Sequence, residues 1–285
     1  MNKQHHAQTA SPYSIAHSSD TIITSRNNPR IKHIRALLKR SEREQTGLAL
    51  VEGLRQVTEA LRYPDLVRQL IIAPELLKSQ HGQALFHKHA TRRLPTLCVS
   101  TEAFQSFSLR EGPQGIAAIV SQHWEQLHQL SLSPGDVWVA LEAIQDPGNL
   151  GTILRSCDAT GCCGVILLDN ATDPYDPITL RASLGALFSR RLIKTSFQAF
   201  AAWKLAHHYP IVGTSDAASL NYRKITYPSP VILLMGSERQ GLSLAQQRLC
   251  DLMVSIPMQG SCDSLNVAVA TSLVLYEIAD QESKQ

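Results

Sequence analysis

The sequence of 285 residues contains no long hydrophobic run. Its most apolar segments are short, such as VILLM at 231–235, whereas a membrane-spanning helix needs roughly 18 or more apolar residues in succession. We therefore expect no membrane partner. The first 20 residues are polar and carry a single lysine, so they resemble neither a secretory signal nor an arginine-rich transit peptide. We expect a disordered tail over 1–20 and a cytoplasmic protein.

Recognisable metal and nucleotide motifs are missing as well. The six cysteines include no CxxC pair, and the adjacent Cys162 and Cys163 cannot form a compact zinc-ligand pattern. The interpretation that remains is a set of buried thiols in a reducing compartment. No HExxH motif occurs, so we predict no metal site. The absence of GxGxxG and GxxxxGK[ST] argues against dinucleotide oxidoreductases and P-loop ATPases.

Charge is distributed unevenly along the chain. Residues 1–130 contain 16 Lys and Arg against 10 Asp and Glu, whereas residues 131–285 contain 11 against 14. The basic half is therefore the candidate for binding a polyanion, although such a pattern is also common on solvated helix faces. Its charge is concentrated in Arg26, Arg30, Lys32, Arg35, Lys39, Arg40 and Arg43. Among these we predict Arg26, Arg30, Lys32 and Arg35 as RNA-binding residues.

The basic segment RIKHIRALLKRSERE, residues 30–44, has its apolar residues at helical spacing and predicts one amphipathic helix with a basic surface. Short strands and helices alternate after it, which predicts a small α/β domain over 21–123. The polar stretch around Pro134–Gly135 follows the last N-terminal strand. We interpret residues 124–135 as a linker and residues 136–285 as a second domain.

The second half alternates strands with helices, which predicts a parallel sheet covered by helices. The expected strands are 137–142, 164–169, 191–195, 211–215, 231–236 and 253–257, and the expected helices include 178–188 and 197–208. A final helix over 265–281 is apolar on nearly every face. Such a helix must be buried on several sides, and a second subunit is one way to bury it.

Three loops follow expected strands, at the edge of a parallel sheet where ligands usually bind. They are IQDPGNLGTILRSCDATG at 144–161, MGSERQGLS at 235–243 and IPMQGSCDSLNVAVA at 256–270. In the first loop Asn149 can cap the following helix, and Arg155 can either clamp a phosphate or pair with Asp158. Ser264 is expected to cap the last helix, and the amides of the glycine-bearing second loop can hold an adenosine ligand.

Together, these three loops closely resemble the signature motifs of the SpoU (TrmH-type) RNA 2′-O-ribose methyltransferases. The resemblance covers nearly all of residues 136–281, including RASLGALFS between the first two motifs. It extends more loosely to the family's N-terminal substrate-binding domain through ITSRNNPRIKHIRALLKR and GLALVEG. Two positions depart from the usual pattern: Arg239, where many members carry glycine, and Cys157, where alanine is frequent.

The resemblance implies an α/β protein with a C-terminal SPOUT domain, in which a parallel sheet carries a deep trefoil knot. It also implies a homodimer and an N-terminal α/β domain resembling small RNA-binding ribosomal proteins. The implied cofactor is S-adenosylmethionine, contacted at Gly236, Ile256 and Leu265. The implied partner is ribosomal or transfer RNA, and the implied catalytic residues are Arg155, Asn149, Glu238, Ser264 and Asn266.

Methyl transfer from S-adenosylmethionine to a ribose hydroxyl requires alignment and removal of one proton, but no metal. Because a guanidinium does not accept a proton at neutral pH, we assign Arg155 first to orientation of the RNA. Two alternatives are a SPOUT protein that only binds RNA and a SPOUT enzyme that methylates a base nitrogen. The complete set of polar motif residues disfavours the first, and the resemblance to the ribose-specific branch disfavours the second.

Overall fold

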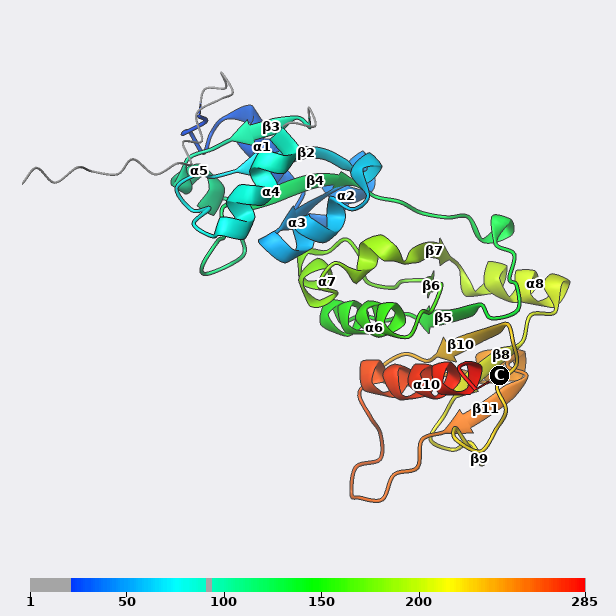
Figure 1. Cartoon of the computed structure of the whole chain (residues 1–285). Helices are drawn as coiled ribbons and strands as arrows, with labels where there is room; N and C mark the ends of the chain where they lie inside the picture. Colours follow the sequence, from blue (N-terminus) through cyan, green and yellow to red (C-terminus); the bar gives the residue numbers. More distant parts are fainter. Residues whose placement is uncertain (1–21, 91–93, 285) are drawn as a thin grey trace, which may run out of the picture.

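The computed structural model describes residues 22–90 and 94–284, and the tail predicted over 1–20 lies outside them. The chain forms two sheets of different size. Figure 1 shows the N-terminal sheet and its helices, drawn in blue and cyan, lying beside the β7 edge of the larger C-terminal sheet. The two parts are α/β structures, as expected from the alternation in the sequence.

The N-terminal sheet has four strands in the order β1-β4-β2-β3, and only the β2–β3 pair is parallel. Its strands are β1 (Leu48–Glu52), β2 (Val67–Ile72), β3 (Thr96–Cys98) and β4 (Ile116–Ser121). Its helices are α1 (Pro29–Ala36), α2 (Arg40–Thr46), α3 (Leu54–Ala60), η1 (Pro64–Leu66), α4 (Gln80–Ala90) and α5 (Thr101–Gln105). One face of the sheet packs against α1 and α5, and α3 covers the other.

The prediction of one continuous helix over residues 30–44 is wrong. The chain breaks between α1 and α2, where Lys39 adopts an extended conformation. The break is stabilised by Arg43, whose Nη1 donates to the carbonyls of Leu37 at 3.0 Å and Leu38 at 2.8 Å. A guanidinium thus replaces the hydrogen bonds that these carbonyls would have received in a continuous helix.

The C-terminal sheet has seven strands, all parallel, in the order β7-β6-β5-β10-β8-β11-β9. They are β5 (Val137–Glu142), β6 (Gly164–Leu168), β7 (Arg191–Thr195), β8 (Ile211–Thr214), β9 (Leu220–Asn221), β10 (Val231–Met235) and β11 (Leu252–Ser255). All five residues of β10 are buried, which explains why a central parallel strand is apolar throughout. The predicted parallel sheet is confirmed.

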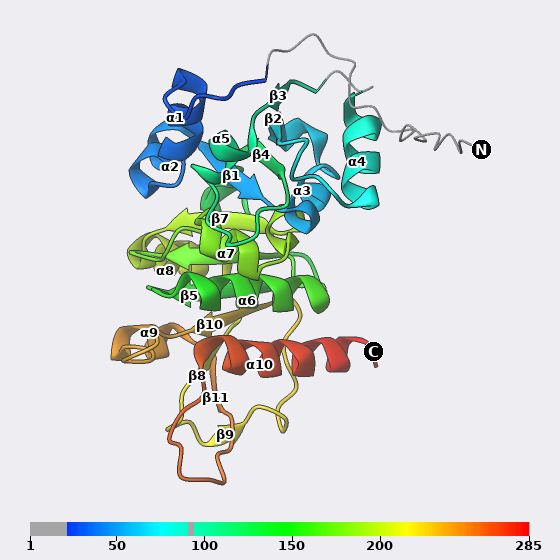
Figure 2. The ribbon, with the colours of Figure 1, turned by 90° about the vertical axis from the view of Figure 1, so that its left-hand side faces the viewer.

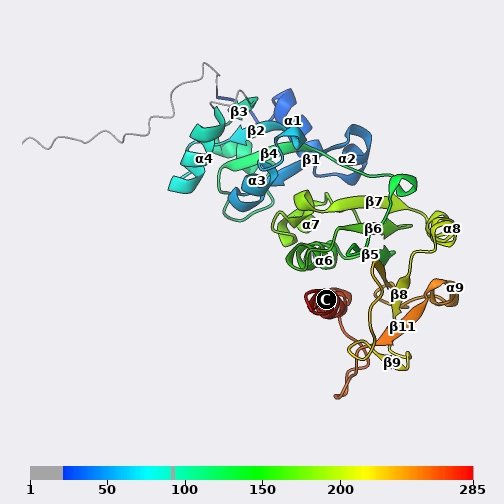
Figure 3. The same ribbon diagram turned by 45° about the vertical axis from the view of Figure 1, so that its right-hand side comes forward.

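Helices cover both faces of this sheet. They are η2 (Leu127–Gln129), α6 (Pro147–Ala159), α7 (Pro177–Ala182), η3 (Ala186–Ser189), α8 (Phe197–His207), α9 (Leu244–Leu249) and α10 (Val267–Glu282). Figure 3 shows α6, α7 and α10 on one side and α8 and α9 on the other. The single helix predicted over 178–188 is wrong, because Leu184 at φ 52° and Gly185 at φ 95° separate α7 from η3.

The two parts of the chain are in direct contact. Arg43 is buried between them and pairs with Asp173 and Asp176, which precede α7. The Tyr175 hydroxyl accepts from the backbone N–H of His123 at 2.7 Å and donates to its carbonyl. The segment predicted as a linker packs along the edge of β7, where the Glu125 N–H donates to the Leu192 carbonyl. The two parts therefore meet over a packed interface.

The expectation that the thiols are buried holds for only part of the set. Cys157 and Cys162 are buried, whereas Cys98, Cys163 and Cys250 are half-buried. Cys262 is exposed because it lies in the loop that joins β11 to α10.

Over residues 22–90 and 94–284, no helix has the length and apolar character needed to cross a bilayer.

Candidate active site

The three loops singled out in the sequence come together at the carboxyl ends of β5, β10 and β11. A cavity of about 520 Å³, in the size range of small-molecule sites, lies beside this meeting point. The second and third loops and the turn after β8 line it, whereas no residue of the first loop does. The three residues predicted to contact the cofactor, Gly236, Ile256 and Leu265, all line this cavity. Glu238 and Ser264 line it as well.

The loop after β10 is a tight turn that depends on Gly236. The backbone N–H and carbonyl of Ser237 pair with the carbonyl and N–H of Gly241 at 3.1 and 3.0 Å. A Cβ at Gly236 would lie 2.2 Å from the carbonyl carbon of Gly241, so no larger residue fits without moving the turn. Gly241 itself has φ 63°, which favours glycine. This turn holds Glu238 beside the cavity.

The helix α6 begins with a different cap from the one predicted. Its N-cap is Asp146, whose Oδ1 accepts from the backbone N–H of Asn149 at 2.8 Å. Pro147 occupies the first turn, where its lack of an N–H costs nothing. The side chain of Asn149 is therefore not used for capping and extends toward the other two loops.

The helix α10 is capped by Asn266, not by Ser264 as predicted. The Oδ1 of Asn266 accepts from the N–H groups of Ala268 at 2.9 Å and Val269 at 3.3 Å. Ser264 lies two residues earlier, and its hydroxyl donates to the Asp263 carboxylate at 3.4 Å. Ser264 is exposed at the cavity wall, so its hydroxyl can meet a substrate.

A chain of hydrogen bonds joins the three loops through Asn266, Asn149 and Glu238. The Nδ2 of Asn266 donates to Asn149 Oδ1 at 2.9 Å, and the Nδ2 of Asn149 donates to Glu238 Oε1 at 2.6 Å. The direction of the chain follows from its ends: Asn266 Oδ1 already accepts from α10, and an ionised carboxylate only accepts. Three of the five predicted catalytic residues are thus joined by hydrogen bonds, with Asn149 in the middle.

Arg155 lies on α6, about two turns after its start, and is exposed. Within the described part of the chain its guanidinium has no hydrogen bond or ion pair. The predicted alternative, an ion pair with Asp158, is wrong, because Asp158 accepts from Arg190 at 3.3 Å and from the Ser189 hydroxyl at 2.6 Å. All the donors of Arg155 therefore remain free for a ligand such as a phosphate.

The carboxyl end of β8 also contributes to the site, which was not predicted from the sequence. The last residue of this strand, Thr214, and the next three, Ser215, Asp216 and Ala217, line the cavity. No glycine-rich motif marks this turn. The signal that could have identified it is positional, because β8 lies between β10 and β11 and its carboxyl end must open on the same edge. Asp216 adds a carboxylate to the wall, which also carries Glu238 and Asp263.

The predicted RNA-binding residues fall into two groups. Arg26, Arg30 and Lys32 are exposed on or just before α1. Arg35 is half-buried, and its Nη2 donates to the Arg26 carbonyl at 3.0 Å and the Ser106 hydroxyl at 3.1 Å. The side chain of Arg35 therefore also connects α1 to α5.

Across the residues that the structure describes, no three His, Cys, Asp or Glu side chains gather into a metal-binding cluster.

Comparisons with family models agree with this geometry. Residues 136–276 match the model of the SpoU rRNA methylase family. Residues 28–118 match the model of the MRM3-like substrate-binding domain. The first match contains the three loops and the cavity, and the second contains β1, β2, β3 and the first half of β4.

Individual relatives are similar over nearly the whole chain. A 23S rRNA (uridine(2479)-2′-O)-methyltransferase from Streptomyces viridochromogenes is 33% identical over 91% of this chain and 92% of its own length. A 23S rRNA (guanosine(2553)-2′-O)-methyltransferase from Bacillus subtilis is 28% identical, over 90% and 98%. The structure of an AdoMet-bound rRNA methyltransferase from Sinorhizobium meliloti superposes with a TM-score of 0.82 and 34% identity, over 91% and 97%. The chain therefore belongs to the SpoU family and is an S-adenosylmethionine-dependent RNA 2′-O-ribose methyltransferase.

Proposed function

We propose that this enzyme methylates a ribose 2′-hydroxyl in the RNA of the large ribosomal subunit. The observation that carries the proposal is the hydrogen-bonded chain Asn266–Asn149–Glu238 at the edge of the cavity. The choice of RNA is supported by two relatives named for 23S rRNA, each of which this chain covers over more than nine-tenths of its length. Transfer RNA is the competing substrate from the sequence, and the experiment below separates the two.

The cavity suits S-adenosylmethionine in both shape and charge. Leu242, Ile256 and Leu265 provide apolar surface for an adenine ring, and the turn at Gly236 provides close approach to backbone groups. The carboxylates of Asp216, Glu238 and Asp263 outnumber the one guanidinium on the wall, that of Arg239, and so give the cavity negative charge that favours a cationic cofactor. When bound, S-adenosylmethionine supplies an activated methyl group, so the protein has to align the ribose and accept or relay one proton.

The polar residues divide this work. Arg155, whose guanidinium has no hydrogen bond or ion pair with the residues that the structure describes, holds a phosphate beside the target ribose and so orients the hydroxyl. Asn149 is fixed between Asn266 and Glu238, so its position depends on all three loops being closed together. Ser264 and Glu238 lie at the cavity wall, where they contact the ribose or the methionyl end of the cofactor.

The N-terminal part acts as the RNA-binding domain in this proposal, with bounds 21–123, a connecting segment 124–135 and a catalytic domain 136–285. Arg26, Arg30 and Lys32 present three exposed cations on one segment. Figure 2 shows α1 and α2 on the same side of the molecule as α8 and α9, while the C-terminal end of α10 lies on the opposite side. RNA bound to α1 therefore approaches the side of the molecule that carries α9, next to the loop with Glu238.

The functional unit in this proposal is a cytoplasmic homodimer with a knotted catalytic domain. Val269 and Tyr276 on α10 remain 47% and 56% exposed, although this helix is apolar on nearly every face. A second copy of the chain that covers α10 would bury them. The cytoplasm is where its ribosomal substrate is assembled, and the knot is the arrangement implied by the family resemblance.

The test is a methyl-transfer assay with the full chain and S-adenosylmethionine carrying a labelled methyl group. Large-subunit rRNA, small-subunit rRNA and total tRNA are offered separately, and the labelled nucleotide is identified by digestion and mass spectrometry. We expect the label on the 2′-oxygen of one nucleotide in large-subunit rRNA. In cells that lack the gene, the same nucleotide should be unmethylated. Label on tRNA alone, or on a base nitrogen, would overturn the proposal.

A further inference from the structure

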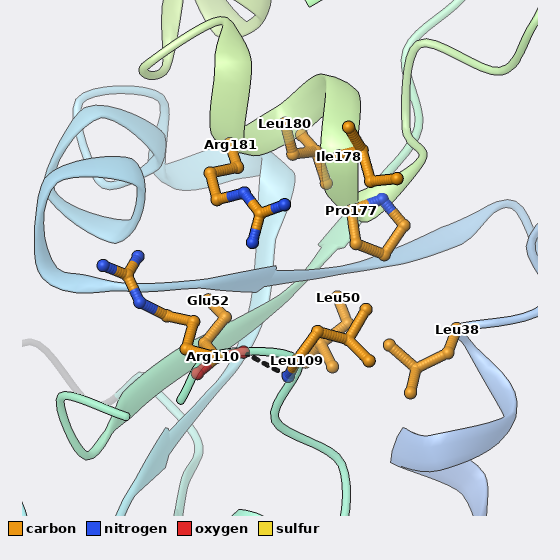
Figure 4. A pocket seen from close by; sticks show the side chains of 9 residues that line it. All are labelled: Leu38, Leu50, Glu52, Leu109, Arg110, Pro177, Ile178, Leu180 and Arg181. Carbon is orange, nitrogen blue, oxygen red and sulfur yellow. Dashed lines mark hydrogen bonds between the residues drawn. The ribbon is translucent and has the colours of Figure 1, made fainter. Parts of the chain in front are cut away.

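A narrow surface notch lies on the seam between the two parts of the chain, away from the cofactor cavity. Figure 4 shows Leu50 and Leu109 on the N-terminal side and Ile178 and Leu180 of α7 on the other, with Arg110 and Arg181 at the rim. Its enclosed volume is about 40 Å³, smaller than a nucleotide. A nucleotide is therefore too large to enter the notch, and it would lie across the boundary between the two parts of the chain.

Both arginines of the notch keep their hydrogen-bond donors available, although the Glu52 carboxylate lies close enough to each to offset part of their positive charge. Within the described residues, neither the Arg110 nor the Arg181 guanidinium makes a hydrogen bond or an ion pair. The carboxylate that lines the notch, Glu52, is occupied: its Oε1 accepts from the Ser108 hydroxyl at 2.6 Å and its Oε2 from the Leu109 N–H at 3.2 Å. The donors of the two guanidiniums are consequently unused.

The rim of the notch also exposes apolar surface. Leu109 is 55% exposed and Ile178 is 45% exposed, and they come from opposite sides of the seam. Free guanidiniums next to exposed apolar side chains match single-stranded RNA, which has anionic phosphates and bases with apolar faces. An acidic protein segment would match the charges as well, but it would not account for the position of the notch.

That position lies between the basic helix α1 and the catalytic loops. Leu38, which follows α1, lines the notch on one side. On the other side α7 packs against α6 so closely that a Cβ at Gly151 would lie 2.5 Å from the Cβ of Ala182. Gly151 follows Asn149 by two residues. Figure 2 shows α7 lying between β1 and α6.

We propose that the RNA strand running from α1 to the catalytic loops crosses this seam, with its phosphates held by Arg110 and Arg181. Leu109 and Ile178 then support an unstacked base or its ribose. The inference rests on the proposed function, because it assumes that the substrate is RNA. It assigns the recognition of flanking nucleotides to a surface built jointly by both parts of the chain.

The test uses the full chain with Arg110→Gln and Arg181→Gln combined, and in vitro transcribed large-subunit rRNA as the probe. We expect at least about a 10-fold weaker Kd, and a salt dependence of log K that is shallower by about 0.7 for each phosphate that the variant no longer binds. S-adenosylmethionine affinity and Tm should match the wild type. Arg223→Gln with Lys224→Gln removes two exposed charges near the far edge of the sheet and should change neither the RNA affinity nor its salt dependence.

Equal RNA affinity and salt dependence in the notch variant and the wild type would overturn the inference, as would an equal weakening in the control variant. If Arg110→Gln lowers Tm, Arg181→Gln alone carries the test, because Arg181 is exposed. Failure of the proposed function would be recognised separately, since the wild-type enzyme itself would then leave large-subunit rRNA unmethylated.

Discussion

Arg43 of α2 and Asp173 of the loop after β6 form an ion pair of 2.7 Å that is almost completely buried between the two parts of the chain. The same guanidinium reaches Asp176 at 3.3 Å and two backbone carbonyls. A residue from a segment rich in surface charge thus acts as the central contact of the interface. Its removal would leave two carboxylates without their cation.

We predict that Arg43→Ala destabilises the protein by about 3–5 kcal/mol, because breaking a buried pair leaves an uncompensated charge. Urea unfolding followed by circular dichroism measures this. The matched control is Arg40→Ala, which breaks the exposed pair with Glu44 and should cost less than about 1 kcal/mol. Equal effects of the two substitutions would contradict the structural role of Arg43.

Arg155→Ala should separate binding from chemistry. Because Arg155 has no structural partner among the described residues, S-adenosylmethionine affinity should stay nearly intact, while methyl transfer slows by roughly 10²-fold or more. Single-turnover transfer and calorimetric titration measure the two quantities. Asp158→Ala is the control, since Asp158 pairs with Arg190 and should leave transfer unchanged. Normal transfer in Arg155→Ala would make Arg155 an ordinary surface residue.

Gly236→Ala should weaken cofactor binding without unfolding the chain. The new methyl group would overlap the backbone of Gly241 and force the turn that carries Glu238 to move. We expect a loss in S-adenosylmethionine affinity of at least about 10-fold, equivalent to about 1.4 kcal/mol. Gly260→Ala is the control, because a Cβ there meets no atom within 4 Å. Unchanged affinity in Gly236→Ala would place the cofactor elsewhere.

Arg30→Gln combined with Lys32→Gln should weaken rRNA binding and make its salt dependence shallower, since both side chains are exposed. Arg35→Gln should instead lower Tm, because Arg35 connects the Arg26 carbonyl to Ser106. Binding titrations at several salt concentrations and thermal melts distinguish the two behaviours. Unaltered RNA affinity in the first variant would reduce that cluster to a solvated helix face.

Val269→Asp with Tyr276→Asp should convert a dimer into a monomer, because two charges would then lie in the proposed interface. Light scattering at micromolar concentration gives the mass. Leu205→Asp is the control: Leu205 is 61% exposed on α8, on the other face of the sheet, and its replacement should leave the mass unchanged. A wild-type monomer under these conditions would refute the dimer.

The sequence by itself determined the parallel sheet and the location of the site. Central parallel strands are buried on both faces, so they appear as continuous apolar runs such as β10, and their carboxyl ends had to bring the three loops to one edge. These patterns depend on residues that are close together in the sequence, so the strands predicted from them agree with the strands of the structure. The family resemblance predicted Gly236, Ile256 and Leu265 as cofactor contacts, and all three line the cavity at that edge.

Only the tertiary structure decided which polar groups are partners. Asn149 meets Glu238 and Asn266 across separations of 89 and 117 residues, and such pairings leave no periodicity in a single sequence. For the same reason Arg43 could not be distinguished from Arg30 and Arg40, which are exposed whereas Arg43 is buried. The environment of a charged side chain depends on the opposite surface that packs against it, and here the loop after β6 supplies that surface.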